Sequence, residues 1–142
     1  HRTWSFNELS ARYRELPEEF YVPDPALIGS QSVNHKQMRE AAAPDAVASG
    51  MIKLACQGAF GVYRELLARG VPRELARSVL PVATYSHMFA KVDLRNLLHF
   101  LDLRLHEHAQ HEIRVFAEAM AKLAEGVAPV AMAAWREGKS HG

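Results

Sequence analysis

The chain has 142 residues, of which 49% are hydrophobic and 23% are charged, and its formal net charge is +1. This composition is typical of a folded globular domain and excludes disordered and fibrous classes, while the near-neutral charge argues against a nucleic-acid-binding surface. Cys56 is the only cysteine, which excludes an internal disulfide and a cysteine-based zinc site and indicates a reducing compartment. Because no apolar run reaches the ~20 residues of a membrane span and no signal peptide is recognisable, we expect one cytoplasmic domain over residues 1–142, without a membrane or nucleic-acid partner.

The start of the chain has no clear hydrophobic period. In residues 1–16, charged residues are interleaved with large apolar ones, namely Trp4, Phe6, Leu9 and Tyr13. The next stretch, "FYVPDPALIG", is interrupted by Pro23, Pro25 and Gly29 and follows Pro17, which is typical of a loop. We predict a loop that contains a short strand over residues 20–22.

Two helices are predicted in the middle of the chain. The first begins at about Pro44 and ends at Gly70. Its apolar and small residues recur at steps of three and four: Val47, Met51, Leu54, Ala55, Gly58, Val62 and Leu66. The segment "VPRELARSVLP" predicts a second, short helix that begins near Pro72 and ends at Pro81.

The segment "VATYSHMFAKV" is rich in β-branched and aromatic residues and predicts one strand over residues 82–92. Three helices are predicted after it. The first covers residues 94–101, and the third lies around residues 131–136, beyond Pro129. The second is longer and carries one apolar stripe: Ile113, Phe116, Met120 and Leu123.

These elements predict an α+β fold that is mostly helical within these residues. A single strand cannot satisfy its backbone hydrogen bonds alone, so we expect its partners to lie outside these residues. The chain also begins without a methionine. We therefore expect a C-terminal portion of a domain, whose strand joins a sheet formed by an absent N-terminal portion.

The first candidate site is the polar block near the start of the chain. Glu8, Ser10 and Arg12 alternate with apolar residues, so an extended backbone would direct all three to one side. A carboxylate, a hydroxyl and a guanidinium on one surface suit a phosphorylated ligand that also forms hydrogen bonds. The alternative is a solvated loop held by salt bridges.

The second candidate is "LRNLLHFLDLRLHEHAQHEIR", in which Arg95, His99 and Asp102 form a polar ridge on a helix. The opposite stripe is apolar: Leu94, Leu97, Leu98 and Leu101. The histidines that follow suggest a metal ligand set, because imidazole is a common metal ligand: His106, His108 and His111. Their spacing does not match a helical zinc motif, and the pair His108 and Glu112 supplies too few ligands, so we predict no metal site.

The third candidate is the pair Arg73 and Arg77, one helical turn apart, beside Glu74, which is able to neutralise either. The simplest interpretation is the solvated face of a helix. Cys56 lies within an apolar helix without a histidine nearby in sequence, which is typical of a core residue. Spacing by itself indicates a mostly helical domain with an arginine-rich polar surface.

A family resemblance goes further. The opening "HR", followed by seven residues and Ser10, resembles the motif of the flavin-dependent thymidylate synthases, an Arg-His-Arg triplet, seven residues and a serine. The first arginine of that triplet would precede His1. The segments "FYVPDP", "GVPRELARSVLPVATYS" and "LRNLLHFLDLRLHEHAQHEIR" resemble this family in order and spacing, so the likeness covers about residues 1–25 and 69–117.

The resemblance implies the reductive methylation of dUMP to dTMP. The carbon donor would be methylenetetrahydrofolate, the redox carrier FAD and the reductant NADPH. It also implies a homotetramer with active sites between subunits.

The resemblance further implies a role for each matching residue. Those that would contact FAD are His1, Arg2, Glu8, Asp93, Leu94, Arg95 and His99. Those that would bind dUMP are Glu8, Leu9, Ser10, Ala11, Arg12, Arg77 and Arg104, with Arg104 against the uracil ring as the catalytic residue. Ser10 would form a hydrogen bond and not act as a nucleophile, because serine needs an adjacent base to attack. Two residues depart from the family pattern, since Asp93 stands where asparagine is common and Ala11 replaces a frequent glycine.

Other hypotheses remain beside this one. A non-catalytic helical interaction module explains the helices but leaves the polar block at the start unexplained, and a truncated chain could be inactive. A helical nucleic-acid binder would use the arginines Arg73, Arg77, Arg95 and Arg104, but the near-neutral net charge counts against it.

Overall fold

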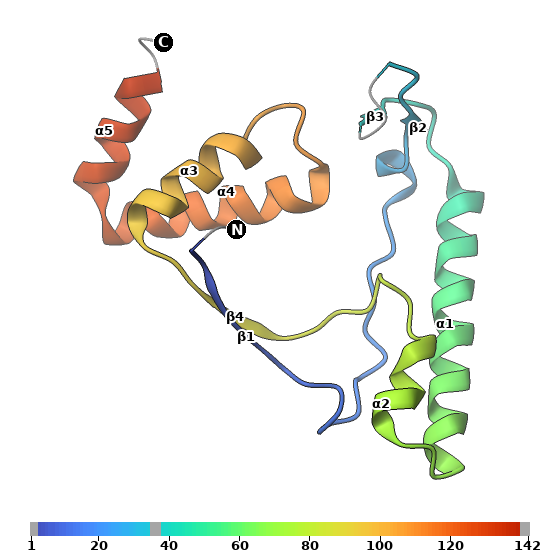
Figure 1. Cartoon of the computed structure of the whole chain (residues 1–142). Helices are drawn as coiled ribbons and strands as arrows, with labels where there is room; N and C mark the ends of the chain where they lie inside the picture. Colours follow the sequence, from blue (N-terminus) through green and yellow to red (C-terminus); the bar gives the residue numbers. More distant parts are fainter. Residues whose placement is uncertain (1–2, 35–37, 140–142) are drawn as a thin grey trace. The chain divides into compact units, whose positions relative to one another are not determined.

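The computed structural model describes residues 3–34 and 38–139 (Figure 1). The chain divides into two compact units. One unit is formed by Phe6–Ala90, and the other by the residues up to Ser5 together with those from Lys91 onward. Each is described by itself below.

The 6–90 unit is built around one long helix, α1, which spans Ala46–Ala68 (Figure 1). Asp45 caps its start by accepting a hydrogen bond from the Ala48 N–H at 2.8 Å. The helix stops before Gly70, whose φ of 77° lies in the left-handed region that glycine adopts most readily. The helix predicted between Pro44 and Gly70 is therefore confirmed.

The core of this unit lies where α1 meets the short helix α2, Arg73–Ala76, and the 3-10 turn Arg77–Val79 that follows it. The fully buried side chains are Phe60, Tyr63 and Ala76. Phe20 stacks on Phe60, with ring centroids 5.8 Å apart. The short helix predicted between Pro72 and Pro81 is present as this helix and turn.

The face of α1 that packs into the core is not the one that the sequence stripe marks. Val47 and Leu54 of that stripe are 73% and 71% exposed, whereas Cys56 on the other face is 3% exposed. Apolar residues lie on both sides of this helix, so periodicity predicts the helix but not the buried side. Cys56 is a buried free thiol, as expected.

The strands are short, and the strand prediction needs correction. β4 covers only Met88–Lys91 and not residues 82–92, because residues 82–83 form a turn in which the Thr84 N–H donates to the Pro81 carbonyl at 3.0 Å. The strand predicted over residues 20–22 is reduced to an isolated bridge between Phe20 and Thr84. Phe20 packs against the core of this unit, a tertiary contact that local sequence does not reveal.

The expectation that β4 finds its partners outside these residues was also wrong in one respect. β4 pairs with β1, Ser5–Glu8, within this chain (Figure 1). Four residues are too few to show a convincing alternation. A second small sheet joins β2, Ser30–Gln31, and β3, Arg39–Glu40, in antiparallel register, after the 3-10 turn Pro25–Leu27.

The other unit contains three helices (Figure 1): α3, Leu94–Arg104; α4, His111–Val127; and α5, Pro129–Lys139. All three were predicted, although α3 and α5 extend beyond the predicted bounds. Their core consists of Leu101, Ala117, Ala121 and Met132. The predicted stripe on α4 is wrong in part, because Phe116 and Leu123 are exposed and alanines make the contact with the neighbouring helices. The fold class, mostly helical with little strand, is confirmed.

No helix in residues 3–34 and 38–139 combines the length and the apolar character needed to cross a membrane.

The packing of α3 generates a first prediction. Leu101→Ala removes a fully buried side chain at the centre of the three-helix core and should lower the free energy of unfolding by about 2–5 kcal/mol. The control on the same helix is Leu103→Ala, which changes a half-exposed residue and should cost about 0.5 kcal/mol or less. Urea unfolding of both variants measures the difference, and equal losses would contradict this core.

Candidate functional site

A cavity of about 390 Å³ lies in the 6–90 unit, at the end of β1. Its wall consists of Glu8, Leu9, Ser10, Ala11, Leu16, Arg77, Leu80, Thr84, Tyr85 and Ser86. Five of the residues that the resemblance assigns to dUMP therefore share one cavity: Glu8, Leu9, Ser10, Ala11 and Arg77. The structure brings together segments that lie almost 70 positions apart in the sequence.

The segment after β1 is a tight turn rather than a continued strand. The Leu9 N–H donates to the His87 carbonyl at 2.8 Å, which fixes the segment to β4. The Ser10 carbonyl accepts from the N–H groups of Tyr13 and Arg14, and the Ser10 hydroxyl oxygen faces the Arg12 N–H at 3.3 Å. Glu8 and Ser10 line the cavity and Arg12 is not among its lining residues, so the extended backbone expected to direct all three to one side is replaced by a turn over residues 11–13.

Some arginines of this unit form ion pairs with glutamates, whereas Arg77, among the described residues, does not. Arg12 pairs with Glu74 at 3.5 Å, and Arg73 pairs with Glu15 at 3.9 Å. For Arg12, the structure therefore agrees with the alternative interpretation of the polar block, a solvated loop held by salt bridges. Both pairs are half exposed and contribute about 0–1 kcal/mol each. Arg77, within the part of the chain that the structure describes, has no ion pair and is available for an anionic ligand.

A second cavity of about 620 Å³ uses the same segment, Glu8 to Ser10, and is more apolar. Its remaining lining residues are Asn7, Tyr13, Arg14, His87, Met88 and Phe89. Sequence reasoning missed this cavity. The sequence feature that pointed to this cavity was the set of aromatic residues interleaved with charged ones near the start of the chain. One of them, Tyr13, lines the cavity and is highly exposed.

The remaining predicted residues lie in the other unit, on α3. Asp93 caps this helix by accepting hydrogen bonds from the Asn96 backbone N–H at 3.0 Å and from the Asn96 side-chain amide at 2.6 Å. Arg95 and His99 are exposed, whereas Arg104 at the last turn is half-buried. Side-chain hydrogen bonds and ion pairs to these three are absent among the described residues. His1 and Arg2 lie outside the described residues.

Asp102 of the polar ridge has a structural partner that the sequence did not suggest. The indole N–H of Trp135 on α5 donates to the Asp102 carboxylate at 2.9 Å. This bond fixes α5 to the helix that carries His99 and Arg104. A hydrogen bond between residues 33 positions apart has no local sequence signal.

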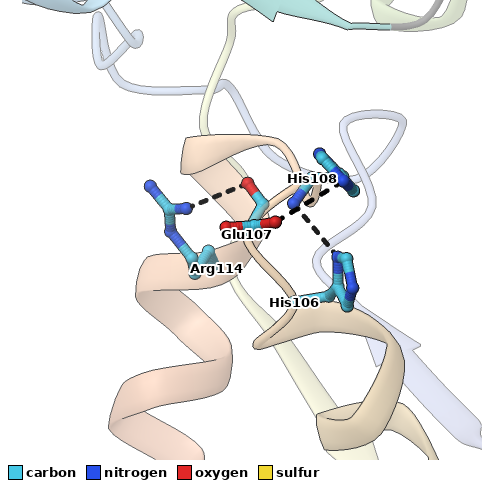
Figure 2. Close-up of polar contacts among 4 residues, drawn as sticks. All are labelled: His106, Glu107, His108 and Arg114. Atoms are coloured by element: carbon cyan, nitrogen blue, oxygen red, sulfur yellow. Dashed lines mark hydrogen bonds and ion pairs between the residues drawn. The ribbon is translucent and has the colours of Figure 1, made fainter.

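His106 and His108 lie in a turn after α3 (Figure 2), whereas His111 is the first residue of α4. His106 accepts the His108 backbone N–H through Nδ1 at 3.2 Å, and Arg114 donates to the Glu107 carbonyl at 3.3 Å. The His108 ring lies 3.6 Å from the Glu107 carboxylate. Across the described ranges, no three His, Cys, Asp or Glu side chains lie together as a metal ligand set.

Comparison with known proteins identifies the family. Residues 1–130 match the family described as "Thymidylate synthase complementing protein". The chain belongs to this family. The resemblance noted from the sequence motifs is thereby confirmed.

Curated members of the family share much of this sequence. A flavin-dependent thymidylate synthase from Thermus thermophilus is 46% identical over 137 residues, which cover 96% of this chain and 50% of the relative. One from Rickettsia conorii is 42% identical over 158 residues, covering 100% of this chain and 54% of the relative. The chain thus spans about half the length of the curated relatives it matches.

A solved structure has the same fold. The UMP/dUMP methylase PolB from Streptomyces cacaoi, crystallised with 5-Br dUMP, superposes with a TM-score of 0.84 at 39% identity. The match covers 96% of this chain and 62% of PolB.

The cap of α3 generates a prediction about pH. Hydrogen bonds from the Asn96 side chain and then from its backbone N–H hold the pKa of Asp93 below its ordinary value of 3.8. Because the folded-state pKa is lowered, the cap contributes its full stability above about pH 3.8 and loses it as the pH falls through the lower, folded-state value.

Asparagine caps helices as well as aspartate but does not titrate, so Asp93→Asn should keep the cap and remove this pH dependence. Asp93→Ala should fray the first turn at every pH. The measurement is the NMR shift of the Asn96 amide during acid titration. A midpoint at or above 3.8 in the unsubstituted protein, or the same transition in Asp93→Asn, would contradict the assignment.

Proposed function

We propose that the intact protein is a flavin-dependent thymidylate synthase that methylates dUMP to dTMP. In this proposal methylenetetrahydrofolate supplies the carbon, and NADPH supplies the reducing equivalents. The observation that carries the proposal is the cavity formed by residues 8–11 and Arg77 in a chain of this family. The curated relatives are named flavin-dependent thymidylate synthases, and PolB is named a UMP/dUMP methylase.

The nucleotide-binding role rests on the chemistry of that cavity. Arg77 offers a planar, permanently charged donor set that suits phosphate oxygens. Ser10 offers a hydroxyl, and Glu8 offers a carboxylate that accepts hydrogen bonds. Arg12 pairs with Glu74, and this ion pair helps to hold the turn after Ser10. For Arg12 to contact a phosphate, this ion pair has to break.

Arg104 is the residue that we assign to the uracil ring. The ring N–H between two carbonyls is weakly acidic, and an adjacent guanidinium stabilises the anion formed when it ionises. That anion raises the electron density at the carbon to be methylated. Arg104 is half-buried and, among the described residues, makes no ion pair that would compete for this role.

The residues on α3 fit a flavin dinucleotide by their donor chemistry. Arg95 and His99 lie one turn apart on the exposed side of the helix, and both are able to donate hydrogen bonds to phosphate oxygens. Asp93 and Leu94 precede them at the start of the helix. When bound, FAD supplies the redox chemistry, while this chain supplies binding and orientation.

We further propose that residues 1–142 belong to one domain of a cytoplasmic homotetramer. The continuous family match over residues 1–130 supports a single domain. The uncovered apolar face of α1, formed by Val47, Met51 and Leu54, supports contact with further protein. A non-catalytic interaction module would use the same face, but it gives no reason for the cavity beside Arg77.

Nucleotide binding is tested by removing one cavity charge. Arg77→Ala should weaken dUMP binding by about 2 kcal/mol, because a charge-assisted hydrogen bond to phosphate is lost. The flavin absorbance of the purified full-length protein should stay unchanged. The matched control is Arg69→Ala, which removes the same charge from the end of α1, where Arg69 pairs with Glu65. Calorimetric titration with dUMP distinguishes them, and full affinity in Arg77→Ala would reject this site.

The role of Arg104 is tested by kinetics. Arg104→Ala should reduce dTMP formation by about 3 kcal/mol in the transition state, the magnitude of an oxyanion-type donor. Arg104→Lys should rescue little, because an ammonium group lacks the planar donor pair of a guanidinium. Turnover of the alanine variant close to that of the unsubstituted enzyme would exclude the catalytic assignment.

A further inference from the structure

The hydroxyl of Thr84 is an unsatisfied polar group beside the proposed nucleotide cavity. Its Oγ1 is enclosed and has no hydrogen-bond partner among the residues that the structure describes. Burying a hydroxyl without a partner is unfavourable, so nearly all such groups in native proteins are paired. Thr84 itself lines the cavity together with Ser10 and Arg77.

The backbone around Thr84 is fixed from both sides. The Thr84 N–H donates to the Pro81 carbonyl at 3.0 Å, and the Tyr85 N–H donates to the Glu19 carbonyl at 2.9 Å. The Ala83 carbonyl accepts from the Tyr21 N–H at 2.9 Å. The main chain is therefore not free to carry the hydroxyl to another protein group. Rotation about χ1 remains, and it moves Oγ1 to another of the three staggered positions around Cβ.

The cavity provides the environment in which this rotation becomes favourable. Arg77 and Thr84 belong to one short run of chain, joined by the 3-10 turn and the Leu80–Pro81 bend, and both line the same cavity. An anion held by Arg77 brings several acceptor oxygens into that space. A threonine hydroxyl turned toward it donates a hydrogen bond to an ionised acceptor, which is stronger than a neutral one.

We propose that Thr84 is a further substrate-binding residue, whose hydroxyl turns into the cavity and donates to the phosphate of a bound nucleoside monophosphate. This inference rests on the proposed nucleotide-binding function of the cavity. It explains why a polar side chain is kept at a position where the protein offers it no partner. A purely structural threonine would have its hydroxyl bonded in the free protein.

The test compares Thr84→Val with Thr84→Ser in the full-length protein. Valine replaces the hydroxyl by a methyl group of nearly the same shape, and serine keeps the hydroxyl. Because the hydroxyl has no partner in the free protein, Thr84→Val should unfold at the same urea midpoint or a higher one. It should nevertheless bind dUMP about 10-fold more weakly, while Thr84→Ser should bind within about threefold of the unsubstituted protein.

Deoxyuridine, which lacks the phosphate, identifies the group that Thr84 contacts. Its affinity should be the same for the unsubstituted protein and Thr84→Val. Equal dUMP binding in Thr84→Val, or an equal loss for deoxyuridine, overturns the phosphate contact while leaving the nucleotide site intact. A fall in the urea midpoint that accompanies the loss of affinity overturns it in favour of a structural role. If the unsubstituted protein itself fails to bind dUMP, both the proposed function and this inference fail.

Discussion

The walls of the cavity that Ser10 and Arg77 line depend on two buried aromatic residues of α1, Tyr63 and Phe60. Tyr63 accepts a hydrogen bond from the Leu16 N–H through its hydroxyl at 3.3 Å, and Leu16 lines the cavity. Phe60 stacks on Phe20, whose backbone bridges to Thr84 on another wall. Ala76 lies in the same buried cluster as Phe60 and Tyr63 and directly precedes Arg77 in the sequence. Three separate wall segments therefore take their positions from one helix face.

This dependence gives α1 a structural role at the cavity although none of the cavity's described lining residues belongs to this helix. Its buried face must hold three segments that have little regular structure of their own. Loops of that kind have few internal hydrogen bonds, so their geometry comes from what they pack against. The helix α1 thus supports the cavity, while the side chains that line the cavity come from other parts of the sequence.

The arginines also divide into a structural group, which forms ion pairs, and a group without ion pairs in the described part of the chain. Arg12, Arg64 and Arg73 pair with glutamates across neighbouring segments and help to join them. Arg77, Arg95 and Arg104 have no such pair among the described residues. Exposed ion pairs stabilise a folded protein only weakly, so these three pairs contribute little to the free energy of unfolding. All three of the arginines without such a pair are residues that the family resemblance assigns to dUMP or FAD, whereas Arg12, which the resemblance also assigns to dUMP, is paired with Glu74.

The sequence predicted the helices well because their signals are local. The recurrence of apolar residues and the stop at Gly70 predicted α1, and the apolar stripe of residues 94–101 predicted most of α3. The side-chain caps at Asp45 and Asp93 are seen in the structure. The strands were predicted poorly, since β1 has only four residues and the chain turns at residues 82–83, where the Thr84 N–H donates to the Pro81 carbonyl. Within the site, residues 8–11 and Arg77 were predicted by resemblance, whereas the turn that removes Arg12 from the cavity and the unsatisfied hydroxyl of Thr84 required three-dimensional structure.

The family resemblance implies two departures, at Ala11 and Asp93, and both residues are compatible with the local backbone. Ala11, where the resemblance implies a frequent glycine, is not among the described residues with positive φ, so the position does not require glycine's conformational freedom. Its methyl group is buried at the cavity wall, where it makes the cavity narrower without straining the turn. Asp93 replaces a common asparagine at a helix cap, where both side chains accept the same backbone hydrogen bond. At both positions the residue present is compatible with the observed backbone, since Ala11 is not among the described positive-φ residues and the Asp93 carboxylate caps α3.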